Sequence, residues 1–350
     1  MLEAFHPAVR TWFERRFPGG PTEPQAAGWK EIEGGGHTLI AALTGSGKTL
    51  AAFLVFIDRL YKAGNGPRVV YVSPLKALAA DIQQNLRTPL REIAAVAAEL
   101  GFQAPDIRVA VRTGDTAAAD RVAMLKHPPD FLITTPESLY LMVTAERSRA
   151  MLASTQTVIV DEIHAVAGNK RGSHLALTME RLAHVADGPV QRIGLSATQR
   201  PIEAIAGLLT GVRTGCVLRC AIIDTGHRRT MDLALELPDD ELGAVASGEQ
   251  MGQILDLICG HVREHRTTLV FVNTRRMAER VAHELGERLG EAVLARGDDP
   301  RDPPDGGAHV AAHHGSLSRE RRQRVEKRLR EGWPRAGAWC SAICSSASPC

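Results

Sequence analysis

The stretch TGSGKT at residues 44–49 restricts the possible folds more than any other part of this 350-residue sequence. It stands between two apolar runs, LIAAL before it and LAAFLVFI after it, which predict a strand, a tight loop and a helix in that order. Glycines in such a loop let backbone N–H groups turn inward around phosphate oxygens, and the following helix directs its positive N-terminal end at the same anion. A flexible Gly/Ser loop with an exposed lysine is the alternative, but the strand and helix on either side argue against it.

The loop matches the phosphate-binding pattern G-x-x-x-x-G-K-[ST] except at its first position, where Ala42 replaces glycine. Lys48 is placed to reach the β and γ phosphates of a nucleotide, and Thr49 can offer its hydroxyl to Mg²⁺. The residues expected to bind the nucleotide here are Thr44, Gly45, Ser46, Gly47, Lys48 and Thr49.

Strand-like apolar runs alternate with helical patterns through the first half of the chain. The runs are RVVYVS at 68–73, FLITT at 131–135, TVIV at 157–160 and VQRIGLS at 190–196, and the clearest helical spacing is at 77–86 and 173–186. This alternation predicts an α/β fold with a parallel sheet and helices on both faces. Ligands of such sheets bind beyond the carboxyl ends of the strands, where the motifs of this sequence fall.

A second set of elements follows after a less regular stretch, so we place a domain junction near residue 217. The set consists of a strand at 267–273, an amphipathic helix at 277–289, a strand edge at 309–315 and a basic helix at 319–332. The expected domains are 1–217 and 218–332, followed by an irregular, disordered tail at 333–350.

DEIH at 161–164 comes directly after the apolar run TVIV. A strand-end Asp is where P-loop enzymes hold Mg²⁺, so Asp161 is the expected metal ligand together with Thr49. Glu162 is placed to orient and polarise an attacking water, which makes Lys48, Asp161 and Glu162 the candidate catalytic residues. Two adjacent acids could also form a solvated turn, but the P-loop about 110 residues upstream favours catalysis. A zinc site has little support because the segment lacks a second spaced histidine.

Composition sets only broad limits on location and partners. Lysine and arginine number 42 against 40 aspartates and glutamates, and this near balance neither requires nor excludes a nucleic-acid partner. The six cysteines lack the spacing of a disulfide scaffold. The N-terminus has no secretory pattern, and no apolar run approaches the roughly 18 residues of a membrane span. We therefore expect a cytoplasmic protein with no membrane contact, and we expect His37, His127 and His227 to be surface histidines.

In that order, TGSGKT, DEIH and SAT at 196–198 resemble the motifs of superfamily 2 DNA helicases of the DEAD/DEAH-box type. Further motifs of that superfamily are resembled by PTEPQ at 21–25, SPLKALAADIQQNL, RTGDT at 112–116, TTPESL at 134–139 and VFVNTRRMAERVAHEL. The segments DEIHAVAGNKRGSHLALTMERL, GLSATQRPIEAIAGLL and HHGSLSRERR are close to the large helicase-related family, and the resemblance covers roughly residues 5 to 332.

The resemblance implies two RecA-like lobes with ATP and Mg²⁺ in the cleft between them. It also implies 3′-to-5′ movement along single-stranded DNA, unwinding of duplexes or DNA/RNA hybrids, and a role in DNA repair. By match, Gln25 reads the adenine, and the residues that couple hydrolysis to lobe movement are His164, Ser196 and Thr198. We expect a monomer.

The same resemblance suggests where nucleic acid binds. The candidate contacts are Pro74, Lys76, Arg112, Thr135, Pro136, Asn273, Thr274, His314 and Ser316. A translocase needs polar groups and helix ends facing a phosphate backbone, and loops after parallel strands supply them. The basic helix at 319–332 could add charge to the track or could be an ordinary solvated face.

After Gly332 the sequence WPRAGAWCSAICSSASPC departs from the family, which would continue with a strand and an arginine-bearing element. Our hypothesis is a frameshifted or truncated product in which the second lobe is incomplete and exposes apolar surface. Such arginines are worth roughly 10³–10⁵ in rate in related enzymes, so we expect impaired hydrolysis. A nucleotide- and nucleic-acid-binding fragment without productive turnover stays open as an alternative, as does an RNA helicase of the same superfamily.

Overall fold

The chain divides into two compact units, Met1–Thr230 and Met231–Cys350, in the computed structural model. The predicted junction near residue 217 stays a prediction. The structure describes residues 2–43, 45–63, 68–74, 76–198, 200–211, 219–225, 232–239, 247–265, 267–290, 310–314, 316–318, 320–321, 324–325, 329 and 337–341.

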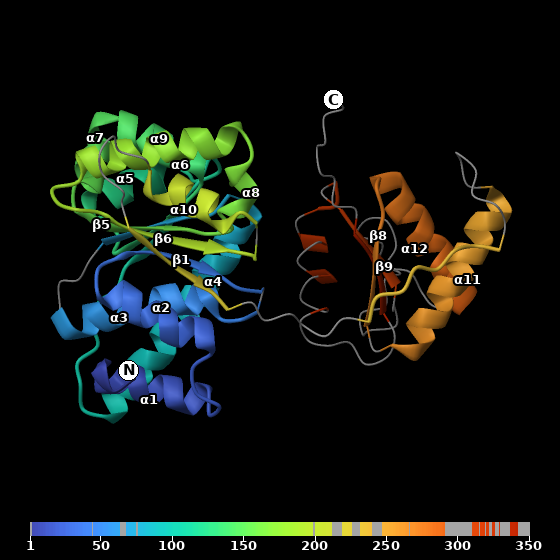
Figure 1. Ribbon diagram of the computed structural model, residues 1–350, viewed down its shortest axis with the longest axis horizontal. Coiled ribbons are helices and arrows are strands. Elements are labelled where there is room, and N and C mark those ends of the chain that lie inside the picture. Colours follow the sequence, from blue (N-terminus) through green and yellow to red (C-terminus); the bar gives the residue numbers. More distant parts are fainter. Residues whose placement is uncertain are drawn as a thin grey trace. The chain divides into compact units, whose positions relative to one another are not determined.

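The described part of the first unit is built on a seven-stranded sheet with the strand order β3-β4-β2-β5-β6-β1-β7 (Figure 1). Every strand pair in it is parallel. The strands are β1 (His37–Ala41), β2 (Arg68–Val72), β3 (Val109–Arg112), β4 (Phe131–Thr134), β5 (Thr155–Val160), β6 (Gln191–Ser196) and β7 (Cys220–Asp224). The predicted α/β class with a parallel sheet is confirmed.

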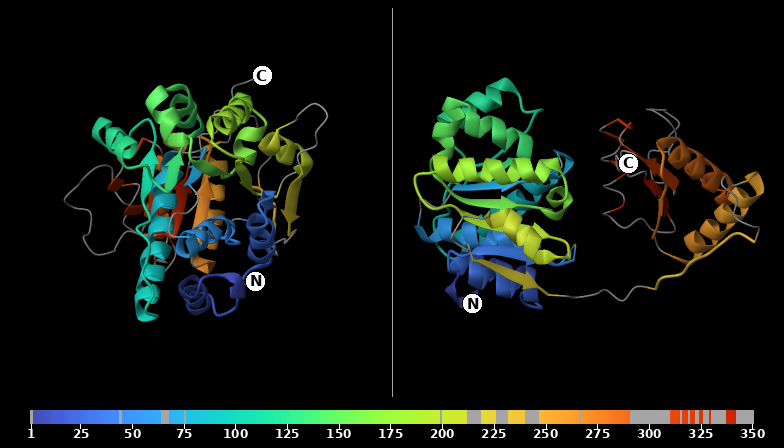
Figure 2. Two further views of the ribbon diagram at one scale, coloured as in Figure 1. Left: turned by 90° about the vertical axis from the view of Figure 1, so that its left-hand side faces the viewer. Right: turned by 45° about the horizontal axis from the view of Figure 1, so that its top comes forward.

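Helices cover both faces of this sheet, as Figures 1 and 2 show. One face carries α1 (Pro7–Arg16), α2 (Glu23–Glu33), α3 (Lys48–Ala63) and α4 (Lys76–Glu99), and a short 3₁₀ helix, η1 (Leu2–Ala4), precedes them. The other carries α5 (Ala118–Lys126), α6 (Pro136–Thr144), α7 (Glu146–Leu152), α8 (His164–Ala167), α9 (Lys170–Val185) and α10 (Ile202–Thr210). The long helix in the left panel of Figure 2 is α4, which has 24 residues and therefore spans about 36 Å.

Two apolar cores result, one on each side of the sheet, because successive strand residues point to opposite faces. In β2, Val69 and Tyr71 belong to the core under α1–α4, whereas Val70 and Val72 belong to the core under α6–α10. A sheet buried on both faces explains why its strands are continuous apolar runs without polar alternation. None of the described helices is long and apolar enough to cross a membrane.

The described part of the second unit has a three-stranded sheet, ordered β8-β10-β9, with two helices packed on it. Its elements are α11 (Gly248–Glu264), β8 (Thr267–Phe271), α12 (Arg275–Leu289), β9 (Val310–His313) and β10 (Gly337–Ser341). The helix predicted at 319–332 lies mostly outside the described residues. One face of β8 is exposed and carries Leu269 and Phe271.

The sequence analysis expected no regular element after residue 332, and the structure differs at β10. This strand pairs in parallel with β8 on one side and β9 on the other, with Trp339 opposite Leu269 and Ala311. β10 thus supplies backbone hydrogen-bond partners to both β8 and β9, which do not pair with each other. Its sequence, GAWCS, is short and apolar enough for a central parallel strand.

Candidate nucleotide site and its neighbourhood

The phosphate-binding loop joins the end of β1 to the start of α3, as its sequence predicts. Gly45 and Gly47 have φ angles of 84° and 83°, a left-handed conformation that glycine adopts without steric cost. A Cβ atom on Gly47 would lie 2.3 Å from Nε2 of Gln25, so side-chain bulk is excluded there as well. The hydroxyl of Ser46 is buried without a hydrogen-bond partner among the described atoms. Thr44 lies outside the described residues.

Gln25 reaches this loop from the first turn of α2. Its Oε1 accepts a hydrogen bond from the backbone N–H of Thr22 at 3.0 Å, and its Nε2 donates to the carbonyl of Gly47 at 3.4 Å. The hydroxyl of Thr22 donates to the carbonyl of Ser46 at 2.9 Å. The cap of α2 therefore holds the loop in place, while recognition of adenine by Gln25 stays a prediction.

Lys48 is buried, with a side chain directed into the loop. Its Nζ donates to the carbonyl of Ala42 at 2.7 Å. Burial lowers the pKa of Lys48, and the nearby carboxylates of Glu162 and Asp161 act against that shift. No carboxylate among the described residues pairs directly with this buried ammonium group, which is therefore suited to an anionic ligand.

The two acids stand at the end of β5, next to β2. Burial raises the pKa of Asp161, although a hydrogen bond from the hydroxyl of Tyr71 to its Oδ2 opposes the shift. Its Oδ1 accepts from the backbone N–H of Glu162 at 2.9 Å. Glu162 has a φ angle of 45°, which is uncommon for a residue other than glycine. Such strained conformations concentrate at functional sites.

His164 connects Glu162 to the motif SAT on the neighbouring strand β6. Its Nδ1 accepts a hydrogen bond from the backbone N–H of Ala197 at 3.1 Å and lies 3.3 Å from the hydroxyl of Ser196. Because Nδ1 accepts, the ring proton sits on Nε2, which is 3.2 Å from Oε2 of Glu162. The structure thus joins three of the predicted residues through one imidazole. Among the described residues, Thr198 takes no part in this chain of bonds.

A cavity of about 450 Å³ adjoins the loop. Lys48, Thr49 and Glu162 line one part of it, and Arg16 and Phe17 from the end of α1 line another. Sequence analysis missed these last two residues because nothing in the N-terminal pattern indicates which later element α1 packs against. The only available signal was a cation and an aromatic ring shortly before PTEPQ.

These features fit a Mg²⁺–nucleotide complex. The loop offers phosphates the buried hydroxyl of Ser46, which has no partner among the described atoms, and the buried ammonium group of Lys48. Thr49 and Asp161 offer the oxygen ligands that Mg²⁺ prefers.

The candidate nucleic-acid contacts of the first unit follow β2, β3 and β4, which are neighbours in the sheet. Pro74 follows β2, Arg112 ends β3, and Thr135 caps α6 immediately before Pro136. Lys76 begins α4, but its side chain is outside what the structure describes. These positions therefore share one edge of the sheet.

Arg171, which sequence analysis did not single out, ties that edge together. Its guanidinium donates to the carbonyl of Pro74 at 2.7 Å and to Oε1 of Glu137 at 2.8 Å. It stands in the first turn of α9, shortly after DEIH in the sequence. Arg171 thus links the segment that follows the catalytic acids to the loops after β2 and β4.

In the second unit, the candidates follow β8 and β9. Thr274 caps α12, accepting from the backbone N–H of Met277 at 3.1 Å, and Asn273 precedes it. His314 is buried with its Nε2 2.6 Å from Oε1 of Glu279. The hydroxyl of Ser316 accepts from Arg275.

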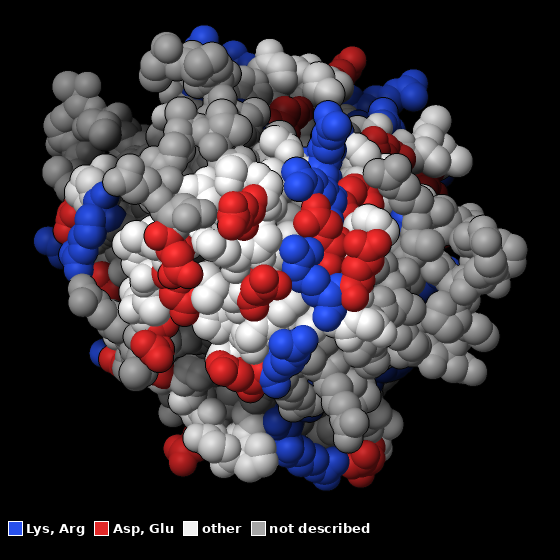
Figure 3. All heavy atoms as spheres, turned by 90° about the vertical axis from the view of Figure 1, so that its right-hand side faces the viewer, with Lys and Arg blue, Asp and Glu red and all other residues white. Residues whose placement is uncertain are grey.

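Surface charge gives little guidance to this track. The face drawn in Figure 3 carries blue and red side chains next to one another and not a field of one sign. Along α12, Arg280 pairs with Glu284 at 2.6 Å, and Arg288 pairs with Asp256 at 3.2 Å. Mixed charge of this kind fits the near-neutral composition of the chain.

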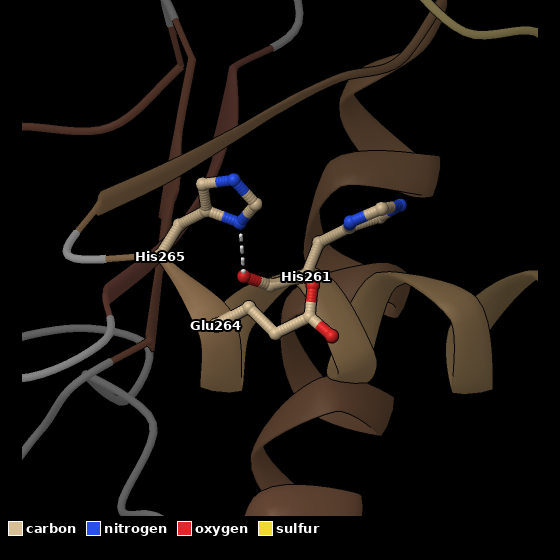
Figure 4. A group of neighbouring side chains, drawn as sticks. All are labelled: His261, Glu264 and His265. Carbon is tan, nitrogen blue, oxygen red and sulfur yellow. Dashed lines mark hydrogen bonds between the residues drawn. The ribbon is translucent and has the colours of Figure 1, made fainter.

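His261, Glu264 and His265 near the end of α11 form the one cluster of potential metal ligands found among the described residues (Figure 4). Their ligand atoms lie within 4.8 Å of one another. Nδ1 of His265 is 2.9 Å from the carbonyl oxygen of His261, and Nε2 of His261 is 2.9 Å from Oε2 of Glu236. Because both rings already have protein partners and face solvent, we assign no metal to this cluster.

A family model described as DEAD/DEAH box helicase matches residues 22–205. The chain belongs to the DEAD/DEAH box helicase family, which confirms the resemblance seen in the motifs.

Several relatives share most of the chain. It is 44% identical to Lhr helicase/probable uracil glycosylase of Mycolicibacterium smegmatis over an alignment of 363 positions, which covers 98% of the chain. It is 42% identical, over 93% of its length, to ATP-dependent helicase Lhr-Core of Methanothermobacter thermautotrophicus. The fold matches a structure of Mycobacterium smegmatis helicase Lhr bound to ssDNA and AMP-PNP with a TM-score of 0.80, 45% identity and 97% of the chain covered. The chain spans 24% and 37% of the two relatives and 42% of that structure.

Proposed function

We propose that the chain binds ATP with Mg²⁺ and couples ATP hydrolysis to 3′-to-5′ movement on single-stranded DNA, acting as a helicase or translocase. The observation that carries the proposal is the continuous contact from Glu162 through His164 to Ser196 and Ala197. The relative named ATP-dependent helicase Lhr-Core and the structure of helicase Lhr bound to ssDNA and AMP-PNP support the same assignment.

Each catalytic side chain has a defined task in this proposal. Lys48 exchanges its bond to the carbonyl of Ala42 for the β and γ phosphate oxygens. Thr49 and Asp161 hold Mg²⁺, which neutralises charge on the phosphates when bound. Glu162 orients and polarises the attacking water. Gln25 contacts the adenine from the cap of α2.

His164 carries the state of this site to the motif SAT. A shift of the Glu162 carboxylate during hydrolysis changes its contact with Nε2 of His164, and the same ring fixes the backbone of Ala197 through Nδ1. By resemblance, Ser196 and Thr198 then couple hydrolysis to lobe movement. We propose a monomer that binds single-stranded DNA or a DNA/RNA hybrid along Pro74, Lys76, Arg112, Thr135, Pro136, Asn273, Thr274, His314 and Ser316.

The 350-residue polypeptide by itself is proposed to turn over ATP slowly. Residues 333–350 contain a single arginine, Arg335, and no segment that resembles the arginine-bearing element of the family. A nucleotide- and nucleic-acid-binding chain without productive turnover is therefore the second candidate.

The decisive experiment measures ATP hydrolysis by the purified chain with and without single-stranded DNA, beside Glu162→Gln. Stimulation by DNA that is lost in Glu162→Gln supports a working ATPase and contradicts slow turnover. Nucleotide binding without stimulation supports the second candidate. Substrates with a 3′ or a 5′ single-stranded tail then test polarity, and an RNA of the same sequence tests the preference for DNA.

A further inference from the structure

Tyr71 is a fully buried tyrosine in the middle of an apolar strand. Its ring stacks on Phe53 with the centroids 4.9 Å apart, in the core beneath α1–α4. A phenylalanine would satisfy this packing equally well. A buried hydroxyl costs about 1–3 kcal/mol when it lacks a partner, so the hydroxyl of Tyr71 must be explained by what it binds.

The hydroxyl has a hydrogen-bond partner on the neighbouring strand. It donates to Oδ2 of Asp161 at the end of β5, since an ionised carboxylate can only accept. Burial, then the nearby Asp161, raises the pKa of Tyr71 well above its ordinary value, so the hydroxyl keeps its proton and its role as donor.

We propose that Tyr71 is a positioning residue for the magnesium site formed by Thr49 and Asp161, because its hydroxyl orients the carboxylate of Asp161. The inference rests on the proposed function, in which those two side chains are the metal ligands. β2 lies next to β5 in the sheet, and the backbone N–H of Asp161 donates to the carbonyl of Val72 at 2.9 Å. The strand that carries Tyr71 therefore also fixes the backbone of the acid.

Both oxygens of Asp161 are oriented by this arrangement. Oδ1 accepts from the backbone N–H of Glu162, and Oδ2 accepts from Tyr71. Each oxygen keeps a lone pair for a cation, but the plane of the carboxylate is set. Outer partners of metal ligands typically contribute 10- to 100-fold in metal affinity, and we expect the same of Tyr71.

Tyr71→Phe removes the hydroxyl and keeps the ring that packs on Phe53. The full chain is titrated with a fluorescent ADP, first in EDTA and then at increasing MgCl₂, to give a nucleotide affinity without metal and a Mg²⁺ midpoint. Tyr140→Phe is the matched control, because Tyr140 packs on His174 on the other face of the sheet and contacts no P-loop residue among those described. Asp161→Asn shows how far the Mg²⁺ midpoint shifts when a metal ligand is lost.

The expected result for Tyr71→Phe is a Mg²⁺ midpoint raised about 10-fold or more, with ADP affinity in EDTA unchanged and Tyr140→Phe equal to the parent. An unchanged midpoint overturns the proposal. An equal loss of ADP affinity with and without Mg²⁺ also overturns it, because that is the signature of general destabilisation. If the parent chain itself shows no Mg²⁺-dependent ADP binding, the proposed function fails first and the role of Tyr71 fails with it.

Discussion

Replacing Gly47 with alanine separates two reasons why the phosphate-binding loop needs glycine. The first is the backbone, because a left-handed φ angle of 83° costs an L-residue about 1–2 kcal/mol. The second is space, because the new Cβ would lie 2.3 Å from Nε2 and 3.1 Å from Cδ of Gln25. Gln25 must then move and lose its two hydrogen bonds, each worth about 0.5–1.5 kcal/mol.

These terms predict that Gly47→Ala lowers the unfolding free energy by about 2–5 kcal/mol. Gly101→Ala is the matched control, since Gly101 has a φ angle of 77° and nothing within 4 Å of its added Cβ. We expect this control to lose only the backbone share, about 1–2 kcal/mol. Urea unfolding followed by tryptophan fluorescence measures both, because Trp29 is fully buried in the core beneath α1–α4.

A double variant isolates the contact between the added Cβ of residue 47 and the side chain of Gln25. Once Gln25→Ala has removed the side chain that the Cβ meets, Gly47→Ala should cost no more than Gly101→Ala does. The coupling energy between the two substitutions is then about 1–3 kcal/mol, in the range found for residues in contact. Equal losses for Gly47→Ala and Gly101→Ala in the parent background, or strict additivity with Gln25→Ala, would refute the reasoning.

Three further predictions concern residues outside the loop. His164→Ala should lower DNA-stimulated ATP turnover about 10- to 100-fold without changing ADP affinity, because it cuts the contact between Glu162 and the motif SAT. Arg171→Ala should weaken binding of labelled single-stranded DNA about fivefold, or roughly 1 kcal/mol, measured by fluorescence anisotropy. Burial, reinforced by Arg192, lowers the pKa of His37, so its contribution to stability is present above the unfolded value of 6.5 and is lost as pH falls through the lowered folded value. His37→Gln should remove that part of the pH dependence between pH 7.5 and pH 5 in urea unfolding.

Each of these has a control in the same unit. His174→Ala alters a histidine that packs on Tyr140, and equal turnover defects in both variants would remove the special role of His164. Arg181 lies on α9 like Arg171. A similar loss of DNA affinity in Arg181→Ala would therefore indicate a general charge effect. His127 is exposed, so His127→Gln is the control for the pH experiment. If the pH dependence of stability survives in His37→Gln but not in His127→Gln, the assignment of that dependence to His37 is contradicted.

Patterns local in sequence predicted much of this fold. The apolar runs at 68–73, 131–135 and 157–160 became β2, β4 and β5, and the loop between β1 and α3 lies where its glycines indicated. Strand period and turn chemistry act over a few residues, so a single sequence carries them. The helix predicted at 77–86 is longer in the structure, Lys76–Glu99, because tertiary packing extends it through Pro89.

Contacts between distant segments could not be predicted in this way. Tyr71 reads as one more apolar residue of its strand until β5 brings Asp161 to its hydroxyl. His37 was expected at the surface, but it is half-buried and accepts a hydrogen bond from the backbone N–H of Arg192 at 3.0 Å. Arg171 was not singled out in the sequence, although it contacts Pro74 and Glu137. In each case the partner lies far away in the sequence, and only the sheet order brings it near.

The position of β1 in its sheet has a consequence for synthesis of the chain. β1 lies between β6 and β7, and β6 begins at Gln191, 150 residues after β1 ends at Ala41. At a translation rate of roughly 5–20 residues per second, roughly 8–30 s pass before the first of its two neighbours has been made. Throughout that interval the nascent chain holds TGSGKT on an apolar strand without a partner, so ATP cannot guide early folding and the strand is a target for chaperones. Nucleotide binding during translation would therefore report the completion of the sheet and not the emergence of the motif.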